Sequence, residues 1–233
     1  MRIALLGYGK MGKAIEAIAL EHGHAITLKI SSATEIFSLQ DCDVAIDFSL
    51  PSSAVTNIST CLKSGVPVIS GTTGWLDQYD KVVSLCESKK GTFLYASNFS
   101  IGVNIFFELN KTLAKLMAKL PQYKVAVEEI HHTQKLDAPS GTAITLANGI
   151  IDETNYEKWT LDTPNKNEIG ILAKRIENVP GTHDINYNSE VDSIQIKHTA
   201  HDRRGFALGA VIAAEFVHDK KGVFTMKDVL NIS

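Results

Sequence analysis

The segment from His131 to Thr142, HHTQKLDAPSGT, gathers residue types that can protonate and bind a small anion. His131 and His132 carry imidazoles that titrate near neutral pH, and Lys135 supplies either a positive charge or a proton. The Ser140-Gly141-Thr142 turn comes just before a helical pattern, where backbone N–H groups and the helix dipole favour a carboxylate or phosphate. Each part alone has an ordinary explanation as surface polarity or a helix cap. Together they predict an anion site with acid–base groups.

Two elements must position this segment. Tyr123 to Ile130 (YKVAVEEI) is β-branched and alternating, which predicts a strand that ends at the histidines. Ala143 to Ile151 predicts a helix opened by the SGT turn. We expect Glu128 and Glu129 on a solvated strand face, with orientation of a histidine as the alternative role. Asp137 is expected to shape the turn.

A second motif, G-x-G-x-x-G, follows the apolar strand Arg2 to Leu6 and precedes a helical pattern over Lys13 to His22. In that setting the first glycine permits a tight turn, the second lets the backbone approach a pyrophosphate, and the third allows close helix–strand packing. The motif predicts a bound dinucleotide. Its expected contacts are Gly7, Tyr8, Gly9, Lys10, Met11 and Gly12.

Strands alternate with helical segments through the first hundred residues. Strands are expected at Ala25 to Ile30, Val44 to Phe48, Val66 to Ser70 and Thr92 to Ala96, with helices around Ser52 to Ser64 and Leu76 to Ser88. This alternation predicts an α/β domain with a Rossmann-type parallel sheet, whose ligands bind beyond the carboxyl ends of the strands. Polar loops at those ends (DFS, GTTG and ASNF) add expected cofactor contacts at Gly71, Thr72, Thr73, Ala96, Ser97, Asn98 and Phe99.

The end of the second strand leaves the choice of cofactor open. An acid there would bind an adenosine ribose, and a nearby arginine would bind a 2′-phosphate. This chain has Lys29-Ile30-Ser31-Ser32 and no acid before Glu35. The serines suit either ribose form, and Lys29 would assist a phosphate if its side chain points outward. NADH and NADPH are both compatible with this sequence.

Past Ser100 the pattern becomes α+β. We expect a helix over Ile105 to Leu120, later strands at Ile169 to Arg175, His183 to Asn188 and Val191 to Ala200, a hairpin turn at Asn188-Ser189-Glu190, and a helix over Gly205 to Val217 before a loop and a short terminal stretch. These elements predict a mixed, mostly antiparallel sheet with helices on one face.

Composition narrows the class of protein. The 233 residues are 44% hydrophobic and 21% charged, as in globular domains, and a net charge of -3 argues against nucleic acid as a partner. The apolar start MRIALLGYGKMG is too short for a signal or membrane segment. The three cysteines and the histidines from position 183 onward show no spacing that suggests a metal site, and no metal is expected.

All three cysteines and four of the histidines are interpreted as structural or surface residues. Three cysteines are expected to be buried free thiols in a reducing compartment, the cytoplasm: Cys42, Cys61 and Cys86. Four histidines are treated as structural or surface residues: His183, His198, His201 and His218.

The combined motifs resemble the 4-hydroxy-tetrahydrodipicolinate reductases (dihydrodipicolinate reductases) of the diaminopimelate–lysine pathway. The resemblance spans essentially the whole chain and rests on GYGKMG, DFS, GTTG, NFSIGVN, HHTQKLDAPSGTA and HTAHDRRGFALGA. It implies an NADH- or NADPH-dependent reduction of a cyclic dicarboxylate, with His131 and Lys135 as the catalytic residues. It also implies substrate contacts at His132, Ser140, Gly141, Thr142 and Arg203.

The resemblance further implies a domain plan and an assembly. Residues 1–99, completed by 204–233, would form the dinucleotide-binding domain, and residues 100–203 the substrate-binding and tetramerisation domain of a homotetramer. Departures are the missing acid after the second strand, a short segment from Ser31 to Asp41, and Thr133 and Gln134 in place of more basic residues. Whether Lys135 or His131 donates the proton stays open. A dehydrogenase for an amino acid or sugar, or a non-catalytic dinucleotide sensor, has no need of HHTQKLDAPSGT.

Overall fold

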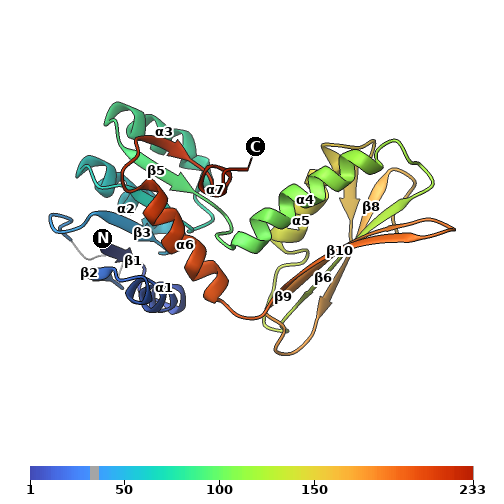
Figure 1. Cartoon of the computed structure of the whole chain (residues 1–233), viewed down its shortest axis with the longest axis horizontal. Helices are drawn as coiled ribbons and strands as arrows, with labels where there is room; N and C mark the ends of the chain where they lie inside the picture. The colour runs from blue at the N-terminus through green and yellow to red at the C-terminus, as the bar shows by residue number, and fades with distance from the viewer. Residues whose placement is uncertain (32–36, 233) are drawn as a thin grey trace. The chain divides into compact units, whose positions relative to one another are not determined.

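The computed structural model describes residues 1–31 and 37–232 and divides into two compact units (Figure 1). The first unit comprises Met1–Ile101 and Arg203–Ser233, and the second comprises Gly102–Asp202. The second unit is therefore an insertion into the first, and the chain passes between them twice.

The first unit is built on a six-stranded sheet in which every neighbouring pair is parallel. Its strands are β1 (Arg2–Leu6), β2 (Ala25–Ile30), β3 (Val44–Asp47), β4 (Val68–Ser70), β5 (Thr92–Tyr95) and β11 (Gly222–Phe224). They lie in the order β11-β5-β4-β3-β1-β2, so the strand order reverses between β1 and β3. Five of these strands were predicted, and β11 was missed because its three residues span the end of the expected loop and the start of the expected terminal stretch.

Helices cover both faces of this sheet. The helical elements of the first unit are α1 (Lys10–Glu21), α2 (Pro51–Lys63), η1 (Leu76–Gln78), α3 (Tyr79–Ser88), α6 (Arg204–Val217) and α7 (Met226–Leu230). Alternate residues of β1 serve opposite faces: Ile3 and Leu5 pack in a cluster with α1 and α6, whereas Ala4 and Leu6 pack in one with α2 and α3. The expected Rossmann-type architecture is confirmed.

The second unit contains a five-stranded mixed sheet in the order β10-β9-β6-β8-β7. Its strands are β6 (Lys124–His131), β7 (Lys158–Thr160), β8 (Glu168–Arg175), β9 (Gly181–Asn188) and β10 (Ser193–Ala200). The β9–β10 hairpin and the β6–β9 pairing are antiparallel, but β6–β8 and β7–β8 are parallel. Parallel pairings are therefore as numerous as antiparallel ones, because the crossover through the helix after β6 returns the chain in the same direction.

Two helices cover one face of this second sheet, α4 (Ile101–Met117) and α5 (Gly141–Ile151). Phe106 of α4 and Leu146 of α5 join Val127, Ile171 and Ile185 of the strands in one apolar cluster. The α4 helix ends three residues before the expected Leu120, in a turn that precedes a proline, which disfavours helical backbone at the residue before it.

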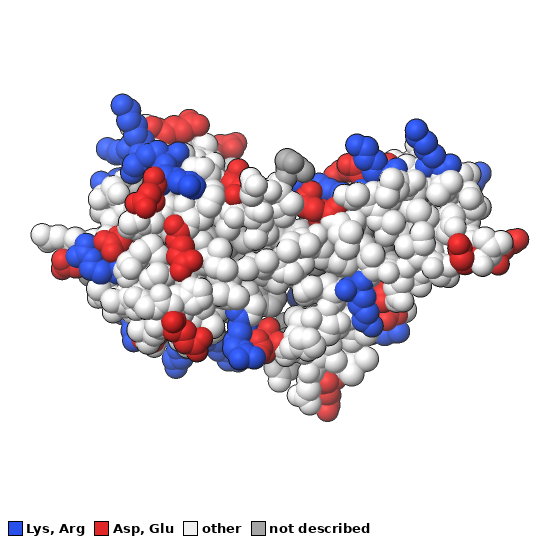
Figure 2. Space-filling view, viewed as in Figure 1, with Lys and Arg blue, Asp and Glu red and all other residues white. Residues whose placement is uncertain are grey.

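Surface properties agree with the composition. Figure 2 shows acidic and basic side chains interspersed over the displayed face.

Cys61 and Cys86 are buried as expected. Cys42 is partly exposed, with its sulfur 3.3 Å from Thr27 Oγ1, so the expectation of three buried thiols is wrong for Cys42. None of the described helices is long and apolar enough to cross a membrane.

Candidate active site

The glycine turn between β1 and α1 has the geometry that its motif requires. Gly7 adopts a positive φ of 101°, and a Cβ at this position would lie 2.1 Å from the Phe48 carbonyl oxygen. A Cβ at Gly12 would lie 2.4 Å from the Gly7 carbonyl oxygen, so helix and turn approach too closely for a side chain. A Cβ at Gly9 would meet nothing within 4 Å. The backbone at Gly9 is therefore open to an approaching phosphate.

Two cavities adjoin this turn at the carboxyl ends of the strands. One, of about 260 Å³, reaches from Gly7 to the ends of β2 and β3. The other, of about 350 Å³, reaches from Gly9 to the Gly71–Thr73 segment after β4. Both are lined by Phe48 and Ser49. They lie where the strand order reverses, which is where open α/β sheets bind their ligands.

The remaining expected cofactor residues follow β5 and differ in exposure. Ser97 is exposed, and Ala96 and Asn98 are partly buried. Phe99 is a core residue, only 2% exposed, and its ring centre lies 5.5 Å from that of Phe48. A contact between Phe99 and a cofactor would therefore involve its backbone rather than its ring.

A buried carboxylate, Asp47, organises the loops around these cavities. Its Oδ1 accepts hydrogen bonds from Ser49 Oγ at 2.7 Å and Asn57 Nδ2 at 3.0 Å. Its Oδ2 accepts from Ser70 Oγ and Thr72 Oγ1, each at 2.8 Å. Burial raises the pKa of Asp47, and the four hydrogen bonds oppose that rise. The sequence showed Asp47 only as part of the DFS motif, because its partners come from three different segments.

The structure shows how Lys29, near the end of β2, is held. Lys29 forms an ion pair with Glu16 of α1, and its Nζ lies 4.8 Å from the centre of the Tyr8 ring. The Tyr8 hydroxyl donates to the other oxygen of Glu16. Lys29 is thus held beside the glycine turn rather than projecting freely. Ser31 lines the first cavity, whereas Ser32 and Glu35 lie outside the described residues.

In the second unit, Glu129 and His131 lie on the inner face of β6. The burial pattern of this strand alternates, so that Glu129 and His131 follow the same face as Val125 and Val127. Glu129 is 0% exposed and its Oε2 lies 2.8 Å from His131 Nδ1. The expectation of a solvated face is wrong for Glu129, and the alternative, orientation of a histidine, is the role that the geometry supports. The sequence signal for the burial of Glu129 was the alternation of residues along β6 with a period of two.

Several donors stabilise the charge on Glu129. Its Oε1 accepts from Arg175 Nη2 at 3.0 Å and from the Ser140 N–H at 3.1 Å. Burial alone would raise the pKa of Glu129, but the close contact with His131 and the hydrogen bonds from Ser140 and Arg175 outweigh it and lower the pKa to about 2. Glu129 is therefore a carboxylate at neutral pH.

His183 of β9 completes this polar cluster. Its ring centre lies 5.1 Å from that of His131, and its Nε2 lies 3.2 Å from Ser140 Oγ. Burial, followed by the charge of His131, lowers the pKa of His183 to about 3, so the ring is neutral. His183 is not a surface residue.

Arg175, at the end of β8, fixes the loop that carries Lys135. Its Nε donates to the Lys135 carbonyl at 3.3 Å and its Nη2 to the Asp137 carbonyl at 2.6 Å. The Lys135 Nζ lies 2.9 Å and 2.8 Å from the two carboxylate oxygens of Asp137, and Lys135 is the main cause of the lowered pKa of Asp137. Asp137 therefore shapes the loop through an ion pair. No sequence motif marked Arg175, which stands opposite His131 in the β6–β8 register.

Only part of the Ser140-Gly141-Thr142 turn before α5 is exposed. Ser140 is 2% exposed and caps the helix, with its Oγ accepting from the Ala143 N–H at 3.2 Å. Because the Ser140 N–H is bonded to Glu129, this residue supports the turn from inside. Gly141 is exposed, and Thr142 and His132 are partly buried. Arg203 lies in the first unit, directly before α6, and is exposed.

These features define a class of protein. A parallel sheet with an open glycine turn at its strand-order reversal, and an inserted α+β unit that carries a histidine, a lysine and a helix start, are the parts of a dinucleotide-dependent oxidoreductase.

Comparisons with known proteins specify the family. Family models for the N-terminus and the C-terminus of dihydrodipicolinate reductase match residues 1–99 and 102–230. A 4-hydroxy-tetrahydrodipicolinate reductase of Christiangramia forsetii is 56% identical over 99% of this chain and 98% of its own, and one of Thermosipho africanus is 36% identical over the same shares. The chain belongs to the dihydrodipicolinate reductase family.

A solved structure supports the fold. The dipicolinate-bound dihydrodipicolinate reductase of Paenisporosarcina sp. TG-14 is similar with a TM-score of 0.77 at 22% identity, covering 97% of each chain. The family models and the 56% identical relative confirm the predicted family, the oxidoreductase class and a nicotinamide cofactor, NADH or NADPH.

Proposed function

We propose that this chain reduces 4-hydroxy-tetrahydrodipicolinate to tetrahydrodipicolinate with NADH or NADPH in diaminopimelate and lysine biosynthesis. The observation that carries this proposal is the buried Glu129–His131 pair beside the loop of Lys135 and the start of α5. It occurs in a chain that is 56% identical to a protein named for this activity.

In this proposal, residues 1–99 with 204–233 bind the cofactor. The open backbone at Gly9 fits a pyrophosphate, and the cavity-lining residues fit the rest of a dinucleotide. The proposed contacts are Gly7, Tyr8, Gly9, Lys10, Met11, Gly12, Gly71, Thr72, Thr73, Ala96, Ser97, Asn98 and Phe99. The bound cofactor supplies the hydride, and the protein supplies orientation and electrostatics.

Residues 100–203 would bind the dicarboxylate. The Gly141 and Thr142 amides at the start of α5 favour a carboxylate. Lys135 would neutralise negative charge, exchanging its ion pair with the exposed Asp137 for one with the substrate. His132 and Arg203 complete the proposed set, and Ser140 contributes by capping the helix.

Proton transfer is assigned to Lys135 and His131. Loss of the 4-hydroxyl as water, followed by addition of hydride to the ring, leaves an enamine that must gain a proton, and both side chains can carry one. The Glu129 carboxylate next to Nδ1 of His131 favours a proton on that nitrogen, which leaves Nε2 as the working atom. Glu129 is thus a positioning residue. Experiment decides whether Lys135 or His131 donates the proton directly to the enamine.

We also propose a homotetramer in the cytoplasm. Leu172 is 55% exposed on the sheet face opposite the apolar cluster that α4 and α5 cover, and β10 is an edge strand with mostly exposed residues. Packing of this face and this edge against another copy of the chain would cover both the exposed leucine and the free edge of β10. Light scattering on the purified protein tests this, and a monomer at micromolar concentration contradicts it.

The activity is tested by following nicotinamide absorbance with freshly generated substrate. We expect oxidation of the cofactor by the wild type and loss of it in Lys135→Ala, with cofactor binding intact. Reduction of NAD⁺ or NADP⁺ by an amino acid or a sugar instead would identify another dehydrogenase. Cofactor binding without turnover of any of these substrates would identify a sensor.

A further inference from the structure

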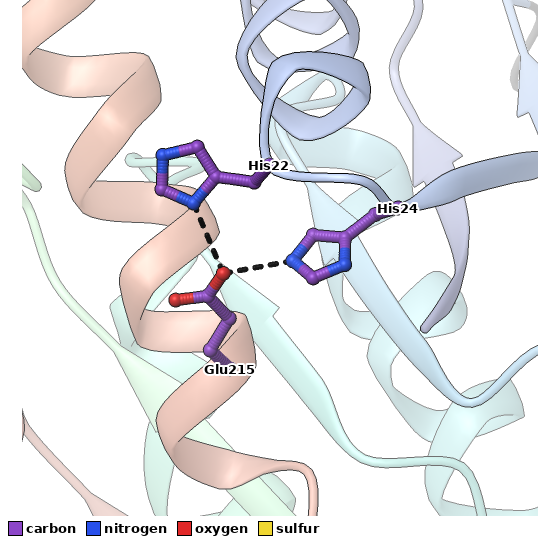
Figure 3. Close-up of side chains that lie close together, drawn as sticks. All are labelled: His22, His24 and Glu215. Carbon is purple, nitrogen blue, oxygen red and sulfur yellow. Dashed lines mark hydrogen bonds and ion pairs between the residues drawn. The ribbon is translucent and has the colours of Figure 1, made fainter.

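Three side chains of the first unit that the proposed function does not use lie close together: His22, His24 and Glu215 (Figure 3). Glu215 Oε1 lies 3.1 Å from His22 Nδ1 and 2.8 Å from His24 Nε2. The ring planes are inclined by 51°, with centres 6.2 Å apart, so the rings do not stack. Both instead aim a nitrogen at the same carboxylate oxygen, as Figure 3 shows.

The backbone holds these residues in place. His22 caps the C-terminus of α1, and its N–H donates to the Ile18 carbonyl at 3.0 Å, while the His24 N–H donates to the Ala19 carbonyl at 2.9 Å. Gly23 between them has a positive φ of 76°, which turns the chain at the helix end. The N-terminal amine of Met1 lies 3.3 Å from His24 Nδ1 and fixes the other edge of that ring.

Glu215 comes from α6, which packs beside α1 on the same face of the parallel sheet. Its carboxylate therefore meets the two imidazoles from a separate element whose position is set by the apolar core. The three ligand atoms all lie within 4.8 Å of one another. The arrangement does not depend on a mobile segment or on the second unit.

We propose that His22, His24 and Glu215 form a binding site for a divalent transition-metal ion, with Zn²⁺ the best match. Two imidazole nitrogens and one carboxylate oxygen are typical ligands of zinc, and they favour it over Mg²⁺ or Ca²⁺. Tetrahedral zinc with bonds of about 2.0 Å separates its ligands by about 3.3 Å, so small side-chain rotations suffice to admit the ion. The side chains of His22, His24 and Glu215 are 33%, 12% and 36% exposed, which leaves room for water as a further ligand.

A second histidine–carboxylate cluster, Glu129 with His131 and His183, is a weaker metal site. Its carboxylate already accepts hydrogen bonds from Arg175 and Ser140, and all three residues are buried. The site on α1 and α6 would instead join two helices of the first unit. Metal binding there would stabilise this unit without entering the proposed reaction.

Calorimetric titration of the full-length, chelator-treated protein with Zn²⁺ tests the proposal. We expect one equivalent to bind to the wild type, with affinity reduced at least about tenfold in Glu215→Gln, since an amide is a poor zinc ligand. Glutamine retains an oxygen that can accept from the imidazoles, so the fold is preserved. His218→Gln removes another histidine of the first unit, paired with Asp219, and should leave zinc affinity unchanged.

Two further measurements make the result decisive. Zn²⁺ should raise the Tm of the wild type and of His218→Gln but not of Glu215→Gln or His22→Gln. Co²⁺ should give the intense visible spectrum of a four-coordinate site in the wild type and in His218→Gln, but not in Glu215→Gln or His22→Gln. Equal zinc affinity of the wild type and Glu215→Gln, or a cobalt spectrum like that of the aqueous ion, overturns the proposal. Reductase activity is expected to be the same in all variants, so failure here leaves the proposed function standing.

Discussion

Glu129 Oε2 lies 2.8 Å from His131 Nδ1, two residues further along β6, and this pair is enclosed between the sheet and the start of α5. Arg175 and Ser140 donate to the other oxygen of the same carboxylate. A charged acid, a histidine and the loop of Lys135 are thereby linked through one network, from which the first three predictions follow.

Glu129→Gln should lower kcat by about tenfold or more and change KM little, because His131 loses the carboxylate that orients it. The pH profile of kcat should also move, which a purely structural role would not cause. We expect unfolding free energy to fall by about 3 kcal/mol, since Arg175 loses its buried partner. The matched control is Glu128→Gln, which loses only a half-exposed pair with Lys174. An unchanged pH profile in Glu129→Gln would contradict the positioning role.

Stability should decline with acid in two stages. The pKa of His183 is lowered to about 3, so the unfolded chain takes up this proton near pH 6.5 while the native state does not. The pKa of Glu129 is lowered to about 2, so its contribution is present above its ordinary value of 4.5 and is lost as the pH falls toward 2. Urea unfolding at a series of pH values measures both. His183→Gln should flatten the upper stage only, and an unaltered curve would argue against a buried neutral His183.

Changes at Lys135 and Asp137 should have opposite effects. Lys135→Ala should lower kcat at least about 100-fold with nearly intact cofactor affinity, because it removes a proton carrier and a charge. Asp137→Asn should lower KM for the dicarboxylate, since Asp137 competes for the Lys135 ammonium. Steady-state kinetics distinguishes the two. A Lys135→Ala enzyme with only a raised KM would show that the lysine binds substrate without taking part in the chemistry.

Lys29 should influence the choice of cofactor. Its ammonium is paired with Glu16 beside the glycine turn, close to the first cavity. Glu16→Gln should release it toward a 2′-phosphate and raise kcat/KM for NADPH relative to NADH, whereas Lys29→Ala should lower that ratio. Measuring kcat/KM with both cofactors checks this. Equal changes for the two cofactors would mean that Lys29 does not sense the phosphate.

The sequence by itself determined the local elements and the family. The glycine turn needed only its own strand and helix to be recognised, and five strands of the parallel sheet were visible as short apolar runs. The segment HHTQKLDAPSGT, which we propose binds an anion, was likewise visible in one place, because its residues are neighbours along the chain. Such signals are local, because the periodicity of a strand or a helix can be recognised in the sequence without knowledge of the rest of the fold.

Only the tertiary structure decided which polar groups are buried together. Asp47 receives donors from three separate segments, Arg175 reaches Glu129 across a strand pairing, and Glu215 meets His22 from another helix. Burying a charge is costly unless partners satisfy it, and those partners lie far away in the sequence. The side chains that organise this protein therefore became recognisable only when the sheets and helices had brought them together.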